Sequence, residues 1–97
     1  MSTTSADRAL AGRDLRYVLT WYLVNEGPLN VARLLSLLDR DGFVVGGRAS
    51  KTVSDALRWE VARRRVVRTG RATYSVGTIP RTTARRIADR ARHLGCR

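Results

Sequence analysis

The sequence contains little of what several common classes of protein require. Its single cysteine, Cys96, cannot form an internal disulfide, which fits a reducing cytoplasm. No apolar run approaches the roughly 18–20 residues that a membrane-spanning helix needs. Residues 1–7 have neither a basic segment nor an apolar one, so no export signal is indicated. We therefore expect a cytoplasmic protein that has no association with membranes.

Residues that build catalytic and metal sites are also scarce. One histidine, His93, and one cysteine cannot supply the roughly four ligands of a typical metal site. No nucleophile is patterned with a base and an orienting group. Residues 46–52 are similar to a phosphate-binding loop, but Val45 and Ser50 stand where that motif requires glycine. The sequence predicts no enzyme activity, no cofactor, no metal and no small-molecule substrate.

Acidic side chains are few, and the balance of charge differs between the two halves of the chain. The 97 residues include 19 Lys+Arg against 8 Asp+Glu, a formal net charge of +11. Residues 1–47 hold five basic and five acidic side chains, whereas residues 48–97 hold fourteen and three. The whole excess of positive charge therefore lies in the second half. This distribution favours a polyanionic partner, and nucleic acid above all.

Apolar residues recur at helical spacing in four segments. The predicted helices are residues 15–25, 31–42, 48–62 and 81–94. Asp14 and Asn30 are suitable N-caps for the first two helices, and Pro80 suits the start of the last. Between the third and fourth helices, β-branched and aromatic residues at 65–69 and 72–76 flank Gly70-Arg71 and predict a β-hairpin. The expected fold class is α+β, mainly α.

This order of elements resembles the winged helix-turn-helix superfamily. The resemblance is carried by GPLNV at 27–31, SKTVSDAL at 50–57 and RVVRTGRATY at 65–74, and it covers about residues 14–77. We accordingly expect three parts. They are a flexible tail over 1–13, a winged helix-turn-helix domain over 14–79, and a basic amphipathic C-terminal helix over 80–97. The connection at 41–47 is longer than the tight turn of the simplest members.

The resemblance implies that the third helix enters the DNA major groove. Its buried side is taken as Val53, Leu57, Glu60 and Val61, at about 100° per residue. The predicted DNA-binding residues of this helix are Arg48, Ser50, Lys51, Thr52, Asp55, Arg58 and Trp59. Arg48 and Arg58 suit guanine edges, whereas Asp55 either accepts from cytosine or orients a neighbouring cation. The same charges also fit the solvated face of an amphipathic helix.

The hairpin corresponds to the wing, which would contact the DNA backbone or minor groove. The residues expected to bind DNA here are Arg63, Arg64, Arg65, Arg68, Thr69, Arg71 and Thr73. Residues 63–65 are interpreted as phosphate contacts, and Arg71 at the tip suits a narrow minor groove. Tyr74 is expected to pack under the hairpin. Trp59 is interpreted either as the edge of the core or as a wedge against sugar and backbone.

Apolar stripes on the first and last helices indicate that these helices pair. We expect the last helix to cover the first, either within one chain or across the two-fold axis of a homodimer. The candidate dimer interface is Tyr17, Trp21, Val24, Ile87, Ala91 and Leu94. A dimer would present two third helices to half-sites about 34–36 Å apart. Alternatively, the basic last helix is itself a second DNA-contacting element or a mobile tail.

The favoured function is that of a duplex-DNA-binding protein of the nucleoid, a sequence-specific transcription regulator. One alternative is a nucleoid-associated architectural protein with little specificity, because neutralising phosphates alone gives tight but salt-sensitive binding. Another alternative is an adaptor that binds RNA or a protein. A regulator typically binds its own site about 10³–10⁷-fold better than random duplex, and that ratio separates the first two functions.

Overall fold

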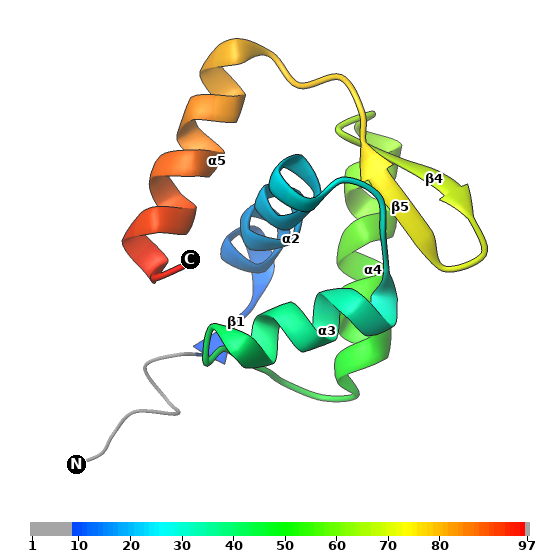
Figure 1. The fold of residues 1–97 in the computed structure, drawn as a ribbon, viewed down its shortest axis with the longest axis vertical. Coiled ribbons are helices and arrows are strands. Elements are labelled where there is room, and N and C mark those ends of the chain that lie inside the picture. The colour runs from blue at the N-terminus through cyan, green and yellow to red at the C-terminus, as the bar shows by residue number, and fades with distance from the viewer. Residues whose placement is uncertain (1–8, 97) are drawn as a thin grey trace.

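Four helices and two small sheets make up residues 9–96, the part of the chain that this computed structural model describes (Figure 1). The helices are α2 (Gly12–Glu26), α3 (Val31–Arg40), α4 (Ala49–Ala62) and α5 (Arg81–Leu94). An antiparallel sheet joins β2 (Leu29–Asn30), β5 (Thr73–Val76) and β4 (Val66–Gly70), in that order. Short β1 (Ala9–Leu10) pairs in parallel with β3 (Val44–Val45). The predicted α+β class, mainly α, is confirmed.

Helix α2 lies at the centre of the molecule, in contact with α3, α4 and α5 (Figure 1). Leu15, Val18, Leu19 and Leu23 are all buried on it. Each such side chain contributes about 1.5–3 kcal/mol through burial. The helix has apolar residues on more than one face because it is covered from more than one side. None of the helices in residues 9–96 is long and apolar enough to cross a bilayer.

The start of α2 differs from the prediction. The helix begins at Gly12, after Ala11, so Asp14 is not its N-cap. Leu10 is buried, and the pairing of β1 with β3 brings the chain into the helix earlier than the sequence pattern indicated. Residues 9–13 therefore belong to β1 and the start of α2 and not to a flexible tail. Residues 1–8 and 97 lie outside the described residues.

The second, third and fourth predicted helices and the hairpin are confirmed, with end points within two residues. The side chain of Asn30 accepts a hydrogen bond from the backbone N–H of Arg33 at 2.7 Å, as an N-cap does. Strand β2 adds Leu29 and Asn30 to the hairpin as a third strand. The hairpin has a register shift between Arg68 and Gly70.

Helix α5 packs against α2 of its own chain (Figure 1). Ile87 and Ala91 are buried, and Arg90 donates to both carboxylate oxygens of Asp14 at 3.0 and 2.9 Å. The expected pairing of the first and last helices is thus made within one chain. In this arrangement Ile87 and Ala91 are not accessible to a second copy, whereas Val24 is half exposed. Homodimer formation stays a prediction.

Candidate nucleic-acid interface

The outer face of α4 and the residue before it carry six of the fourteen side chains predicted to contact DNA. Val53, Leu57 and Glu60 are buried on the inner face. The exposed residues are Arg48, Ser50, Lys51, Asp55, Arg58 and Trp59. Thr52 differs from them because its hydroxyl donates to the carbonyl of Gly46 at 3.1 Å and holds the loop before the helix. Sequence periodicity therefore placed the exposed and buried faces of this helix correctly.

Asp55 lies between two cations on this face. Lys51 Nζ donates to Asp55 Oδ2 at 2.9 Å, and Arg58 Nη1 lies 3.9 Å from Asp55 Oδ1. The hydrogen bond from Lys51 lowers the pKa of the Asp55 carboxyl below its ordinary value. Of the two roles weighed for Asp55, orienting its neighbours is the one seen in this structure. All three side chains are exposed, so an incoming anion can displace the carboxylate.

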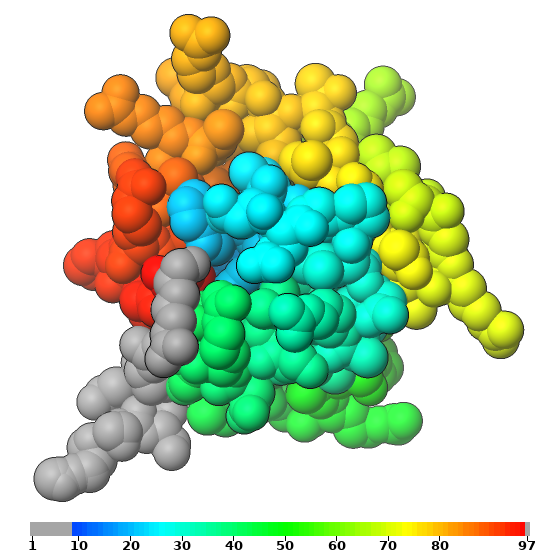
Figure 2. Space-filling model, viewed as in Figure 1, coloured from blue at the N-terminus to red at the C-terminus, as the bar shows by residue number. Residues whose placement is uncertain are grey.

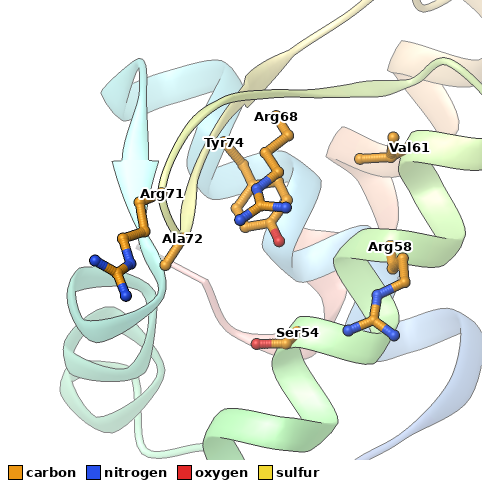
Figure 3. A pocket seen from close by; sticks show the side chains of 7 residues that line it. All are labelled: Ser54, Arg58, Val61, Arg68, Arg71, Ala72 and Tyr74. Carbon is orange, nitrogen blue, oxygen red and sulfur yellow. The ribbon is translucent and has the colours of Figure 1, made fainter.

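A groove of about 410 Å³ separates α4 from the hairpin (Figure 3). Its lining residues are Ser54, Arg58, Val61, Arg68, Arg71, Ala72 and Tyr74. Three of them are arginines, and no acidic side chain is among the described residues that line it. Ser54 and Arg58 come from α4, and Arg68 and Arg71 come from the hairpin opposite (Figure 3). The groove is therefore a positively charged channel between two structural elements.

The tip of the hairpin is fixed to the rest of the fold. Residues 71 and 72 form the loop between the two strands, and Ala72 has a φ of 53°. The carbonyl of Ala72 accepts a hydrogen bond from the N–H of Val31 at 3.0 Å, and the Thr73 hydroxyl donates to the carbonyl of Arg71, also at 3.0 Å. These bonds hold exposed Arg71 at the mouth of the groove. As predicted, Tyr74 is buried under the hairpin.

Arg65 is not placed as a phosphate contact, contrary to the sequence-based expectation. Its Nε and Nη2 donate to Glu60 Oε1 and Oε2 at 2.7 and 3.0 Å. Glu60 is only 1% exposed, and this hydrogen bonding raises the pKa of the Arg65 guanidinium. Arg16 Nε also lies 3.2 Å from Glu60 Oε2, as an ion pair without hydrogen-bond geometry. A buried carboxylate requires such partners, so Arg65 has a structural role.

Trp59 forms an aromatic platform beside this buried pair. The guanidinium carbons of Arg16 and Arg63 lie 3.8 and 3.1 Å from the centroid of its ring. Guanidinium groups at this range are attracted by the electron-rich ring face. Trp59 is 38% exposed and is not among the residues packed against the hydrophobic core, so both of its expected roles stay predictions; Arg63 lies against its ring. Arg64, also expected to contact phosphate, is exposed and has a φ of 65°.

Sequence reasoning missed the pair between Glu60 and Arg65, although a signal was present. A carboxylate on the apolar side of a helix has to find a cation, and Arg65 follows one turn after Glu60 where the chain leaves the helix. Residues 9–96 contain no group of three or more His, Cys, Asp or Glu that could hold a metal ion. Comparisons with protein-family models, with curated proteins and with solved structures found no match to this chain. A functional proposal therefore rests on its own side chains.

Proposed function

We propose that this chain is a duplex-DNA-binding protein with the winged helix-turn-helix arrangement. The elements α2, β2, α3, α4, β4 and β5 follow one another in the order typical of that superfamily, with α4 as the recognition helix and the hairpin as the wing. The observation that carries the proposal is the groove between α4 and the hairpin, with Arg58, Arg68 and Arg71 on its walls and no acidic residue among its described lining.

The recognition helix supplies groups that suit base edges. The DNA major groove is about 12 Å wide and admits one α-helix. Arg58 on α4 and Arg48 just before it are exposed, and their guanidinium groups match the two acceptors of guanine. On binding, phosphates or bases would replace Asp55 as the partner of Lys51 and Arg58. The freed carboxylate could then accept a hydrogen bond from cytosine. Specific reading of sequence is therefore assigned to the outer face of α4.

The groove itself suits the sugar–phosphate backbone. A strand that passes between recognition helix and wing would bring its phosphates to Arg68 and Arg71 on the hairpin wall of the groove, while Arg58 on the α4 wall is left for the bases. Guanidinium groups form paired hydrogen bonds with phosphate oxygens, and the hydroxyl of Ser54 is a further donor. Contacts of this kind fix the register of the protein on DNA and make its affinity fall as salt concentration rises.

A second candidate is an architectural protein that binds DNA with little sequence preference. It is favoured by the arginines that lie outside α4 and the hairpin, on α5, because contacts to phosphate carry no sequence information. Both candidates share the groove as the DNA-binding site. They differ in the ratio of specific to random binding.

Genomic DNA fragments tested at near-physiological salt, with sequencing of the bound fraction, separate these functions. A regulator enriches a short motif, and Arg58→Ala is expected to cost about 1–3 kcal/mol of binding free energy and to relax preference at one base. Retention without a motif indicates the architectural function. A matched control is Arg13→Ala, which removes an exposed arginine from α2. No retention of DNA, or equal losses for the two variants, contradicts the proposal.

A further inference from the structure

Helix α5 carries three arginines that the fold does not use. Arg81, Arg85 and Arg86 are exposed, and none has an acidic partner among residues 9–96. The neighbouring arginines differ, because Arg90 bonds to Asp14 and Arg92 Nη2 donates to Asp89 Oδ1 at 2.9 Å. The unpaired positive charge is thus confined to the first half of the helix.

The positions of these arginines lower the stability of α5 when no ligand is bound. Arg81 and Arg85 are one turn apart, where like charges repel. They also lie at the N-terminal end, where the helix dipole favours negative charge, and the first turn holds no acidic residue. Stability alone therefore does not account for these residues. A bound polyanion would reverse both effects, because it would neutralise the repelling charges.

The arginines of α5 and the groove lie on different sides of the molecule, with α2 between them (Figure 1). Helix α2 is in contact with both α4 and α5 and lies between them (Figure 1). The buried side chains of α4 and of α5 face inward, so the exposed faces of the two helices are on opposite sides of α2. In Figure 2, the orange side chains of α5 project at the upper left, while the yellow hairpin projects at the right.

The geometry points to α5 as a second DNA-binding surface, by which one molecule bridges two duplex segments. This inference rests on the proposed function, since the first segment occupies the groove between α4 and the hairpin. The second segment would contact Arg81, Arg85 and Arg86 through its phosphates alone. Contacts to phosphate carry no sequence information, so the second contact would be independent of sequence.

Two other uses of α5 fit the observations less well. A dimer formed through the exposed face of α5 would bring like charges together, which costs free energy. A single duplex that followed both surfaces would have to bend around α2, and bending of a short duplex is opposed by its stiffness. Binding of two segments of one long DNA molecule involves neither like-charge repulsion between proteins nor sharp bending of a short duplex. Once the first is bound, the second is also held nearby at high effective concentration.

The test is a capture experiment with two duplexes of random genomic sequence. One duplex is fixed to beads, the protein is bound to it at near-physiological salt, and a second, labelled duplex is then added. We expect the wild-type chain to capture the labelled duplex. The variant Arg81→Gln/Arg85→Gln should stay on the beads but capture roughly tenfold less, because two phosphate contacts are lost. Glutamine keeps helix propensity, and the variant should melt no lower than the wild type.

The control variant Arg13→Gln/Arg92→Gln removes the same number of exposed arginines, one from α2 and one from the second half of α5. It should capture the labelled duplex nearly as well as the wild type does. Bridging is overturned if the wild type stays on the beads without capturing the second duplex, or if the α5 variant captures as much as the wild type. It is also overturned if labelled single-stranded RNA is captured in place of duplex. If the protein does not bind the duplex on the beads, the proposed function itself is contradicted. That outcome is distinct from a failure of bridging, in which the protein binds the beads but captures no second duplex.

Discussion

Two clusters of arginines lie beside α4, one buried and one in the groove, and they differ in their carboxylate partners. In the buried cluster, Arg65 and Arg16 surround the carboxylate of Glu60. In the groove, Arg58, Arg68 and Arg71 line an open channel that has no carboxylate among its described lining residues. The same type of side chain therefore stabilises the fold in one cluster and is available to a ligand in the other. Counting positive charge along the chain does not separate these roles, whereas the position of each carboxylate does.

Removal of Arg65 is expected to have the largest effect on stability. Arg65→Ala leaves Glu60 buried without its main partner, which costs about 3–5 kcal/mol of unfolding free energy. Arg58→Ala should change the unfolding free energy by less than about 0.5 kcal/mol, because Arg58 is exposed. Thermal unfolding followed by circular dichroism measures both. Equal melting temperatures for the two variants would contradict the claim that only the buried cluster stabilises the fold.

Gly77→Ala is expected to disturb both clusters together. A Cβ atom at this position would lie 2.5 Å from the carbonyl oxygen of Arg64, which is backbone and cannot rotate away. The hairpin would have to shift relative to α4, at a cost of about 1–3 kcal/mol. We therefore expect a lower melting temperature and weaker DNA binding in the same variant. A variant of full stability would show that the hairpin is free to move, contrary to the structure.

A smaller, pH-dependent effect is expected from the ion pair between Arg90 of α5 and Asp14 of α2. The hydrogen bonds from Arg90 lower the pKa of Asp14 below its ordinary 3.8, so the folded state favours the ionised carboxylate. The ion pair therefore stabilises the folded state fully at pH values above the ordinary pKa of Asp14. As pH falls below that value toward the lower pKa of the folded state, the carboxylate is protonated and this stabilisation is lost. Asp14→Asn should thus be less stable than the wild type at pH 7, with the difference shrinking as pH falls below about 3.8. Melting curves at several pH values test this, and a constant difference would contradict it.

The smallest effect is expected at Arg64, which is exposed and belongs to neither cluster. Arg64→Ala should weaken binding to all DNA sequences alike and reduce the slope of log Kobs against log salt by about one. Titrations of two unrelated duplexes at several salt concentrations give this slope. A loss restricted to one sequence would indicate that Arg64 reads a base.

Much of the fold was predictable because local signals determine it. The Asn30 cap, the helical spacing and the two-residue period identified the helices and the hairpin, and the apolar stripes on two helices indicated their pairing. The pairing of β1 with β3 was missed because each strand is only two residues long and its partner lies far along the chain. The bond between Asp14 and Arg90, which are 76 residues apart, likewise depends on the final packing. Ion pairs of this kind occupy some arginines and leave others available to a ligand, so the binding residues cannot be identified before the packing is known.

The central claim is that the groove arginines bind DNA and the buried cluster does not. The most direct test is the salt dependence of duplex binding for the wild type and for Arg68→Gln/Arg71→Gln, with thermal unfolding measured in parallel. The account predicts that the double variant keeps its melting temperature, while the slope of log Kobs against log salt falls by about 1.8, or about 0.9 for each phosphate contact. An unchanged slope in a folded variant would contradict the claim.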